Sequence, residues 1–209
     1  MKNLFITFEG GEGSGKSTII KKLEEYFNNE GINFIKTREP GGCSISEQIR
    51  EVIVNKENTL MDYTVEAMLY ASARGQHLKE KIRPALEEGK MVICDRYIDS
   101  NLVYQGYARG LGIEPILKAN ELINYIQPDL TFYFDLDPEI GLERINKDKN
   151  REINRLDLES MDFHKKVRKG YLALAKQFKR IVIIDANRTP DEIFEEVKNI
   201  IDSKIKELN

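Results

Sequence analysis

The segment GGEGSGKST, residues 10–18, has the composition of a loop that binds phosphate groups. Its first eight residues match the pattern G-x-x-x-x-G-K-[ST] in full, after a strand-like apolar run and before a helix-like one. Glycines let backbone N–H groups approach anionic oxygens, Lys16 supplies charge for the β- and γ-phosphates, and the Ser17 hydroxyl is a ligand for Mg²⁺. A glycine-rich turn without function is the alternative, and the match of both pattern and context argues against it. The predicted triphosphate-binding residues are Gly10, Gly11, Glu12, Gly13, Ser14, Gly15, Lys16, Ser17 and Thr18.

A Mg²⁺ site next to such a loop also needs an acidic residue at the end of a neighbouring strand. The apolar runs VICD and FYFD end at Asp95 and Asp135. We favour Asp95 as the metal ligand, because Arg96 and further polar residues follow it directly. Asp135 is interpreted as a structural residue at the end of its strand.

Arginines suited to a phosphorylated acceptor lie after strands or on helices that could border the same cleft. A guanidinium grips a phosphate through two parallel hydrogen bonds. Tyr70 and Arg74 are four residues apart on one helix face, so a ring could stack on a base while the guanidinium reaches an exocyclic oxygen. A surface role for Arg50 and a core role for Tyr70 remain alternatives. The candidate arginines are Arg38, Arg50, Arg74 and Arg96.

A basic segment at about residues 146–157 has the charge of a lid that closes over phosphates. Phosphoryl transfer depends on positioning and on neutralising charge, and a kinase must keep water from the γ-phosphate. A solvated charged loop is the alternative interpretation. The cations in or beside this segment are Arg144, Lys147, Lys149, Arg151 and Arg155.

Other triphosphate-binding classes fit the sequence less well. A GTPase would usually carry N-K-x-D after a strand, whereas the nearest match here, NKDK at residues 146–149, ends in lysine and follows a helix-like run. A motor or remodelling ATPase usually has a longer chain. These comparisons favour a small-molecule phosphotransferase.

The elements that must position these residues alternate along the chain. Apolar runs without clean alternation predict strands at residues 3–9, 32–37, 90–95, 129–137 and 180–185. Helical patterns are found at residues 16–31, 44–54, 63–88 and 161–178, and others begin at 138 and 190. This order predicts a single α/β domain over residues 1–209, a P-loop NTPase-type three-layer sandwich whose five-stranded parallel sheet has helices on both faces. In such sheets the ligand binds beyond the carboxyl ends of the strands.

The composition of the chain limits which binding partners and which cellular location can be expected. The formal net charge of −3 gives no basic field for nucleic acid, and no apolar run reaches the roughly 20 residues that cross a bilayer. The first strand-like run leaves no room for a signal peptide, and the two cysteines, Cys43 and Cys94, suit a reducing cytoplasm. His77 and His164 are far apart in the chain, so a zinc site is not expected.

Four blocks of the sequence resemble the thymidylate kinase family, in that family's order and over almost the whole chain. They are FEGGEGSGKST at residues 8–18, TREPGG at 37–42, DRYIDSNLVYQG at 95–106 and NRLD at 154–157. The resemblance implies a homodimer that uses ATP and Mg²⁺ to phosphorylate dTMP to dTDP.

The resemblance also implies individual roles at the acceptor end. Arg96 would hold the dTMP phosphate and help to organise Mg²⁺, while Arg38 and Arg50 border the same phosphate and Glu39 belongs to the dTMP site. Tyr70 would stack on thymine where the family usually has phenylalanine, and Arg74 would reach a thymine carbonyl. Ser100 and Gln105 would hydrogen-bond the base, and Tyr104 would crowd the 2′ position of the sugar. The dTMP-binding residues so implied are Arg38, Glu39, Arg50, Tyr70, Arg74, Arg96, Ser100, Tyr104 and Gln105.

Catalytic roles follow from the same resemblance. Glu12 matches an acidic position near the sugar 3′-hydroxyl and the metal, and Lys16 and Arg96 act on the phosphates. Some family members carry an arginine within the phosphate loop, and this chain does not. The missing cation would come from Arg151 or Arg155 in the lid, as in bacterial-type members, with Arg144 as a further candidate beside ATP.

Two alternatives remain at this stage. A deoxynucleoside kinase of the same architecture would need a base to deprotonate a hydroxyl, and Glu12 is poorly placed for that role. A nucleotide-binding module without catalysis would leave the acceptor arginines and the basic segment without a purpose.

Overall fold

The predicted strands form one parallel sheet in the computed structural model, which describes residues 4–147 and 154–208. The strand order within this part of the chain is β2-β3-β1-β4-β5, and every neighbouring pair is parallel. The strands are β1 (Phe5–Gly10), β2 (Phe34–Arg38), β3 (Met91–Asp95), β4 (Leu130–Asp135) and β5 (Ile181–Asp185). The predicted α/β fold with a five-stranded parallel sheet is therefore confirmed.

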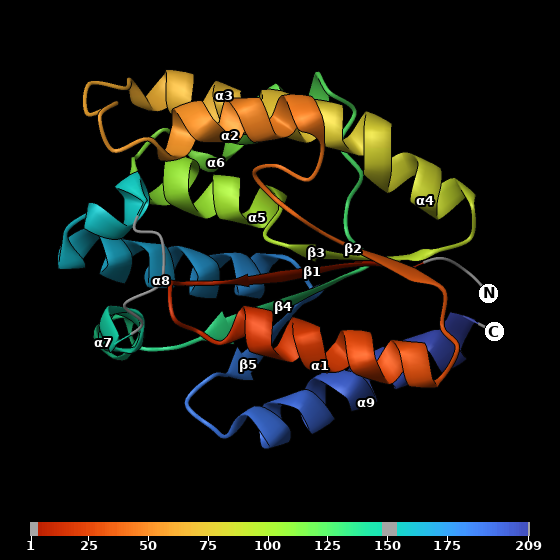
Figure 1. Ribbon diagram of the computed structural model, residues 1–209. Helices are drawn as coiled ribbons and strands as arrows, with labels where there is room; N and C mark the ends of the chain where they lie inside the picture. Colours follow the sequence, from red (N-terminus) through yellow and green to blue (C-terminus); the bar gives the residue numbers. More distant parts are fainter. Residues whose placement is uncertain (1–3, 148–153, 209) are drawn as a thin grey trace.

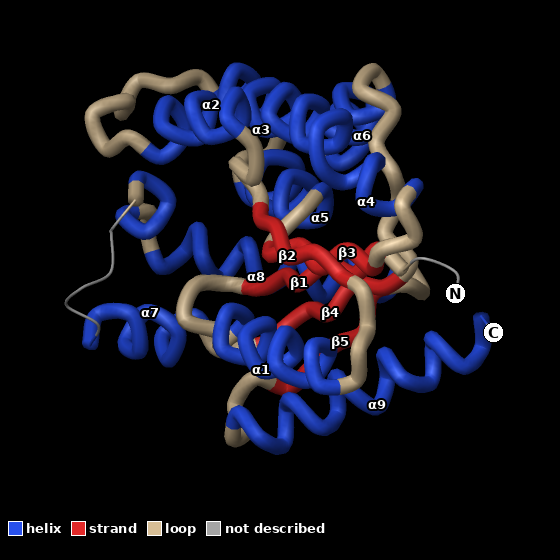
Figure 2. Tube along the Cα trace, turned by 45° about the vertical axis from the view of Figure 1, so that its right-hand side comes forward, coloured by secondary structure: helices blue, strands red, loops and turns tan. Residues whose placement is uncertain are grey.

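Helices cover both faces of this sheet (Figure 1). On one face lie α1 (Lys16–Asn29) and α9 (Pro190–Leu208), side by side in both views (Figure 1 and Figure 2). On the other side lie α2 (Ser44–Val54), α3 (Tyr63–His77), η1 (Leu78–Ile82), α4 (Arg83–Glu87), α5 (Ile98–Asn101), η2 (Leu102–Ala108), α6 (Ile113–Glu121) and α8 (Met161–Gln177). The remaining helices are α7 (Pro138–Lys147), which follows β4, and the short η3 (Arg155–Leu158), which precedes α8.

The side chains of each strand alternate between two apolar clusters. Ile6 and Phe8 of β1 pack with Leu23 of α1 and Val197 of α9. Phe5 points to the opposite face and packs with the helices there. Because both faces of the sheet are buried, the strand sequences are nearly continuous apolar runs, which is why they were recognisable as parallel strands.

The register of the sheet brings the candidate residues to one edge. Phe8 of β1 and Arg38 of β2 both pair with Asp95 of β3, and Gly10 of β1 pairs with Phe134 of β4. The segments that follow β1, β2 and β3 therefore leave the sheet next to one another. These segments contain the phosphate loop, the TREPGG block and the DRYIDSNLVYQG block.

The helix predicted over residues 63–88 is not uniform. It consists of α3, the π-helical segment η1 and α4, with Pro84 in the first turn of α4. Proline lacks an N–H and its ring would clash with the carbonyl oxygen of Glu80, four residues earlier, in a regular α-helix. The wider π-helical turns before Pro84 relieve this clash.

Neither cysteine is in a disulfide in this structure. Cys94 is buried in β3, where burial raises the pKa of its thiol well above the ordinary value, and Cys43 is half-buried. Across the described residues, no helix combines the length and the apolar character needed to span a bilayer.

Candidate active site

The phosphate loop joins β1 to α1 and packs tightly against α7. Gly13 has a φ of +67°, and a Cβ atom at this position would lie 2.2 Å from the carbonyl oxygen of Gly141 in α7. A side chain there would both strain the backbone and collide with a backbone oxygen. The structure therefore requires glycine at this position of the loop.

Lys16 is buried inside the loop, at the first residue of α1. Its ammonium donates hydrogen bonds to the carbonyl oxygens of Gly10 at 3.1 Å and Gly11 at 3.0 Å, and to Ser14 Oγ at 3.2 Å. Burial, and then the positive charge of Arg96, lower the pKa of Lys16 to about 8. Its hydrogen-bond partners are neutral oxygens, so an anionic phosphate would stabilise the ammonium better.

Asp95 is the acidic residue whose surroundings fit a metal ligand. Its Oδ1 atom is buried and has no hydrogen-bond partner among the described residues, and it lines the same cavity as Ser17. A carboxylate and a hydroxyl are hard oxygen ligands of the kind that Mg²⁺ prefers, with phosphate oxygens and water completing its shell. No cluster of three His, Cys, Asp or Glu side chains that could hold a metal ion occurs within residues 4–147 and 154–208.

Asp135, the other strand-end aspartate, is a structural residue as predicted. Its carboxylate accepts hydrogen bonds from Arg168 Nε at 2.8 Å, Arg168 Nη2 at 3.0 Å and Tyr133 Oη at 2.8 Å. Both of its oxygens are thus occupied by protein donors, in contrast to Asp95.

One cavity of about 540 Å³ extends from the phosphate loop to the α3 side of the sheet. This volume lies within the usual range for small-molecule sites. The predicted residues that line it are Glu12, Gly13, Ser14, Gly15, Lys16, Ser17, Thr18, Arg38, Glu39, Arg50, Tyr70, Arg74, Asp95, Arg96, Ser100, Tyr104, Gln105 and Arg144. Gly10 and Gly11 do not line it, although their carbonyl oxygens bind Lys16.

Arg96 lines this cavity in a strained backbone conformation. Its φ of +65° is rare for a residue with a side chain. Its guanidinium donates to Glu12 Oε1 at 2.6 Å and to Ser100 Oγ at 3.3 Å, and lies 5.4 Å from the centre of the Tyr104 ring. Strain of this kind persists where the surrounding structure holds a functional side chain in place.

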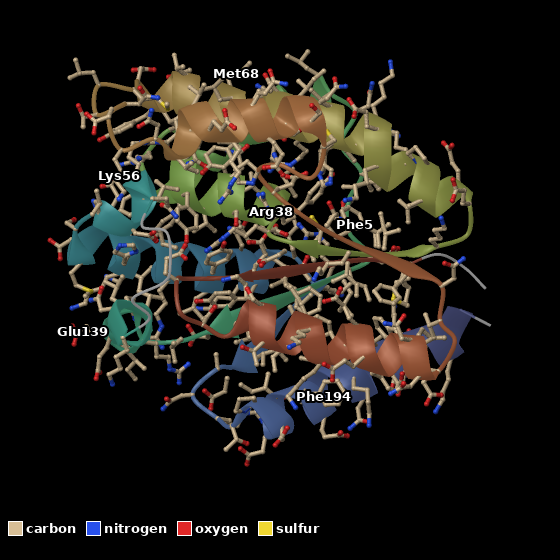
Figure 3. All side chains as sticks on the ribbon, viewed as in Figure 1. Phe5, Arg38, Lys56, Met68, Glu139 and Phe194 are labelled. Carbon is tan, nitrogen blue, oxygen red and sulfur yellow. The ribbon has the colours of Figure 1, made fainter. Side chains whose placement is uncertain are left out.

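Arg38 and Arg50 border the loop between β2 and α2. Both donate a hydrogen bond to the carbonyl oxygen of Pro40, Arg38 at 2.7 Å and Arg50 at 3.2 Å. Arg38, labelled in Figure 3, also forms an ion pair with Glu47 at 2.8 Å. Two cations of the cavity wall thus converge on one turn, as a phosphate site requires.

Tyr70 and Arg74 both lie in the cavity wall, as their spacing on one helix predicts. The Tyr70 side chain is almost completely buried, and burial raises the pKa of its hydroxyl. Arg74 donates to Glu39 Oε2 at 2.7 Å and to Asn120 Oδ1 at 2.6 Å. Gln105 is held nearby, since its amide donates to Glu66 Oε1 at 2.7 Å. This end of the cavity thus combines a flat ring with directed polar groups, as a base site does.

Two predicted substrate contacts have side chains committed to the protein itself. The Ser100 hydroxyl donates to Glu9 Oε2 at 2.6 Å and accepts from Arg96, so it helps to hold Arg96. The Glu39 carboxylate binds Arg74 through one oxygen and His77 through the other. Both residues line the cavity and each also holds an arginine of its wall.

The structure separates the predicted lid cations. Arg144 lies beside the phosphate loop, with Nη1 at 3.4 Å from the carbonyl oxygens of both Gly13 and Ala186. Arg155 does not line the cavity, because its guanidinium binds Glu66 at 2.5 Å and the carbonyl oxygen of Ile53 at 3.1 Å. Arg151 lies outside the described residues.

Several buried polar residues of the site were not predicted. Glu9 lies at the end of β1, where it accepts from the backbone N–H of Tyr97 at 2.7 Å, and burial and then Asp99 raise its pKa to about 7. Glu66 and His77 share the buried side of α3 with Tyr70 and Arg74. One signal was present: a helix face that carries a tyrosine and an arginine toward a cleft also carries polar residues at helical spacing. The unpredicted residues are Glu9, Glu66, His77, Asn101, Arg109 and Asn120.

Comparisons with known proteins agree with this geometry. A family model described as "Thymidylate kinase" matches residues 8–197. The "Thymidylate kinase" of Clostridium novyi (strain NT) is 56% identical over 202 residues, which cover 96% of this chain and 98% of that one. The protein of the same name from Bacillus velezensis is 51% identical over 100% of this chain and 99% of its own. The crystal structure of thymidylate kinase from Ehrlichia chaffeensis has a TM-score of 0.78 and 32% identity, covering 97% of this chain and 99% of that chain.

Proposed function

The chain belongs to the thymidylate kinase family, and on that premise we propose that it transfers the γ-phosphoryl group of ATP to the phosphate of dTMP, giving dTDP and ADP. The observation that carries this proposal is the continuous cavity of about 540 Å³, with a phosphate loop at one end and Tyr70 and Arg74 at the other. Two nucleotides that meet end to end place their phosphates between these ends, beside Arg96.

The donor nucleotide is held by the phosphate loop. Backbone N–H groups of the loop and the N-terminus of α1 face its phosphates, and Lys16 exchanges its neutral oxygen partners for phosphate oxygens. Arg144 lies beside Gly13 and adds positive charge from α7. This end of the site therefore fixes the γ-phosphoryl group at the middle of the cavity.

Asp95 and Ser17 are the residues that would hold Mg²⁺. When bound, the ion neutralises charge on the β- and γ-phosphates and orients them. The unpaired buried Oδ1 of Asp95 is the feature of this chain that supports the assignment.

The acceptor phosphate lies among Arg96, Arg38 and Arg50. Arg96 stands next to Asp95 in the chain and is held by Glu12, so it spans the gap between the two nucleotides. An acceptor phosphate oxygen is already ionised at neutral pH, so no general base is required. Catalysis then rests on alignment and on charge neutralisation in a site closed to water.

The base of dTMP is placed against Tyr70, Arg74 and Gln105. The tyrosine ring offers a flat face for stacking, and the arginine and glutamine offer polar atoms to the base edge. The Tyr104 hydroxyl, which is buried without a hydrogen-bond partner in the described part of the chain, stands where it would crowd a 2′-hydroxyl.

We further propose that the protein is a cytoplasmic homodimer and that Arg151 supplies a lid cation to the transferring group. The cysteine usage supports the location. Arg155 is better described as an anchor of the lid, because it is bound to Glu66 of α3.

An assay of ADP release over a panel of nucleoside monophosphates and nucleosides tests the function. We expect turnover with dTMP, ATP and Mg²⁺, and none with thymidine. Phosphorylation of thymidine instead would identify a deoxynucleoside kinase. Tight ATP binding without turnover on any acceptor would identify a nucleotide-binding module.

A further inference from the structure

We infer that Thr37, His77 and Glu39 form a buried hydrogen-bond relay that positions Arg74 and thereby sets recognition of the acceptor base. The inference rests on the proposed function, because it concerns how the dTMP end of the cavity is built. These three residues are positioning residues: they act on the substrate through Arg74.

The relay joins the end of β2 to α3. His77 follows Arg74 by three residues, so both side chains lie on one face of the helix. The Glu39 carboxylate bridges them, with Oε1 at 3.0 Å from His77 Nδ1 and Oε2 at 2.7 Å from Arg74 Nε. A single carboxylate thus sets the relative position of the imidazole and the guanidinium.

The hydrogen bonds assign the proton on the imidazole. A carboxylate can only accept, so His77 Nδ1 carries the proton toward Glu39. His77 Nε2 lies 2.6 Å from Thr37 Oγ1, and in the neutral imidazole with a protonated Nδ1 it accepts a hydrogen bond from that hydroxyl. With a neutral imidazole, the charges of Glu39 and Arg74 cancel, as burial of the group requires.

The relay is almost completely shielded from solvent, and of its residues Glu39 and Arg74 line the cavity. The exposed fractions are 6% for Thr37, 5% for Glu39, 0% for His77 and 1% for Arg74. A Cβ atom on Gly42 would lie 2.5 Å from His77 Nε2 and 2.7 Å from Thr37 Oγ1, and the φ of Gly42 is +90°. The loop backbone therefore packs directly on the contact between threonine and histidine.

The opposite side of the Arg74 guanidinium is held as well. Nη1 donates to Asn120 Oδ1 at 2.6 Å and to Asn101 Oδ1 at 3.3 Å. Nη2 forms no hydrogen bond with any residue of the described part of the chain, and Arg74 lines the cavity. The relay and the two asparagines thus leave one nitrogen of the guanidinium for a carbonyl of the base.

The dissociation constants of two ligands test the inference by calorimetry. The first is dTMP, and the second is 1,2-dideoxyribose 5-phosphate, which keeps the sugar and the phosphate but lacks the base. We expect His77→Ala to weaken dTMP binding by about tenfold, the loss of one buried charge-assisted hydrogen bond, while binding of the second ligand changes less than twofold. His77→Asn, whose amide can still donate to Glu39, should recover most of the affinity, and Thr37→Val should weaken dTMP binding by a smaller factor.

Thr7→Val is the matched control for Thr37→Val. Thr7 is also a buried strand threonine, with its Oγ1 at 2.7 Å from Thr131 Oγ1, and it lies outside the cavity. The Thr7→Val substitution should lower the stability of the protein without changing the ratio of the dissociation constants of dTMP and of the ligand without a base. An unchanged ratio in His77→Ala would overturn the relay and leave the function intact. If the unmodified protein bound dTMP no better than the ligand without a base, the substrate itself would be wrong.

If the His77 variants fail to fold, the protonation of the His77 imidazole can still be measured on the unmodified protein. The chain has two histidines, so ¹⁵N spectra of its imidazoles contain two sets of signals, which His164→Asn assigns. We expect a protonated Nδ1 and an unprotonated Nε2 in His77. The opposite tautomer, or a doubly protonated ring, would overturn the proton assignment on which the relay depends.

Discussion

Individual residues of the site owe their properties to burial and to the charges beside them. Lys16 and Glu9 are taken out of water within one small region at the end of β1, where the charge of Arg96 acts on both. Burial disfavours the charged form of the lysine and of the glutamate, and each pKa moves toward neutrality. The phosphate loop is therefore electrostatically prepared for an anion that restores the charge on Lys16.

The affinity for ATP should depend on pH through Lys16. Its pKa of about 8 means that the ammonium is mostly present at pH 7 and mostly lost at pH 9. Phosphate binding requires the ammonium, so affinity for a non-hydrolysable ATP analogue should fall by about tenfold for each pH unit above 8. Titration calorimetry between pH 7 and pH 9 measures this, with Lys16→Met as the control. The same slope in Lys16→Met would show that another group is responsible.

At the scale of elements, the site depends on which segments the parallel sheet places at one edge. The strands were predictable because central parallel strands are buried on both faces and read as apolar runs. The helices between β3 and β4 were not predicted, and the long helix of residues 63–88 was predicted as one piece. In the long helix, Pro84 interrupts the apolar periodicity. Between β3 and β4, the buried polar groups of α5 and η2 interrupt it.

The two lid arginines should differ in their kinetic effects. We expect Arg151→Ala to lower kcat by at least tenfold with little change in the dissociation constant of dTMP, since a lid cation acts on the transition state. Arg155→Ala removes an anchor on Glu66, so its effect should not add to that of Glu66→Gln in a double-mutant cycle.

Stopped-flow turnover and dTMP calorimetry separate these roles. Lys147→Ala is a suitable control, because Lys147 is an exposed cation whose visible partner is Glu143 on the same helix. Equal turnover in Arg151→Ala and the unmodified protein would end the assignment of Arg151. Additive losses in the cycle would show that Arg155 acts independently of Glu66.

At the scale of the whole molecule, α2 and α3 form an outer layer with exposed apolar side chains. Val65 and Met68 of α3 are 51% and 44% exposed, and Val52 of α2 is 46% exposed. Figure 3 shows Met68 at the outer surface of this layer. Exposed apolar side chains that gather on one surface are typical of a contact between proteins.

The proposed homodimer should form through this layer. We expect the paired substitutions Val65→Asp and Met68→Asp to convert the dimer to a monomer, because each would bury a charge in the interface. Sedimentation velocity measures the mass directly, and Leu122→Asp, which changes an exposed apolar residue beyond α6, is the matched control. A dimer that survives the paired substitutions would place the interface elsewhere.

The sequence by itself determined the parallel α/β fold, the phosphate loop and most residues that line the cavity. The fold, the phosphate loop and the arginines were predictable because they depend on local patterns: apolar runs, glycine spacing and polar residues placed directly after strands. Glu39, Ser100, Tyr104 and Gln105 were expected only from the resemblance to a known family. Glycines and a lysine at the spacing found in GGEGSGKST are typical of a phosphate-binding loop, so phosphate binding could be predicted without a structure.

The tertiary structure decided which side chains support the others. Ser100 and Glu39 proved to hold Arg96 and Arg74, and Arg155 proved to be bound to Glu66. His77 and Glu66 were missed because a buried polar residue on a helix is distinguished mainly by its hydrogen-bond partners, and these partners are 38 to 89 residues away in the chain. Hydrogen-bond partners distant in the chain are set by how helices pack on the sheet, and spacing along one segment does not encode that packing.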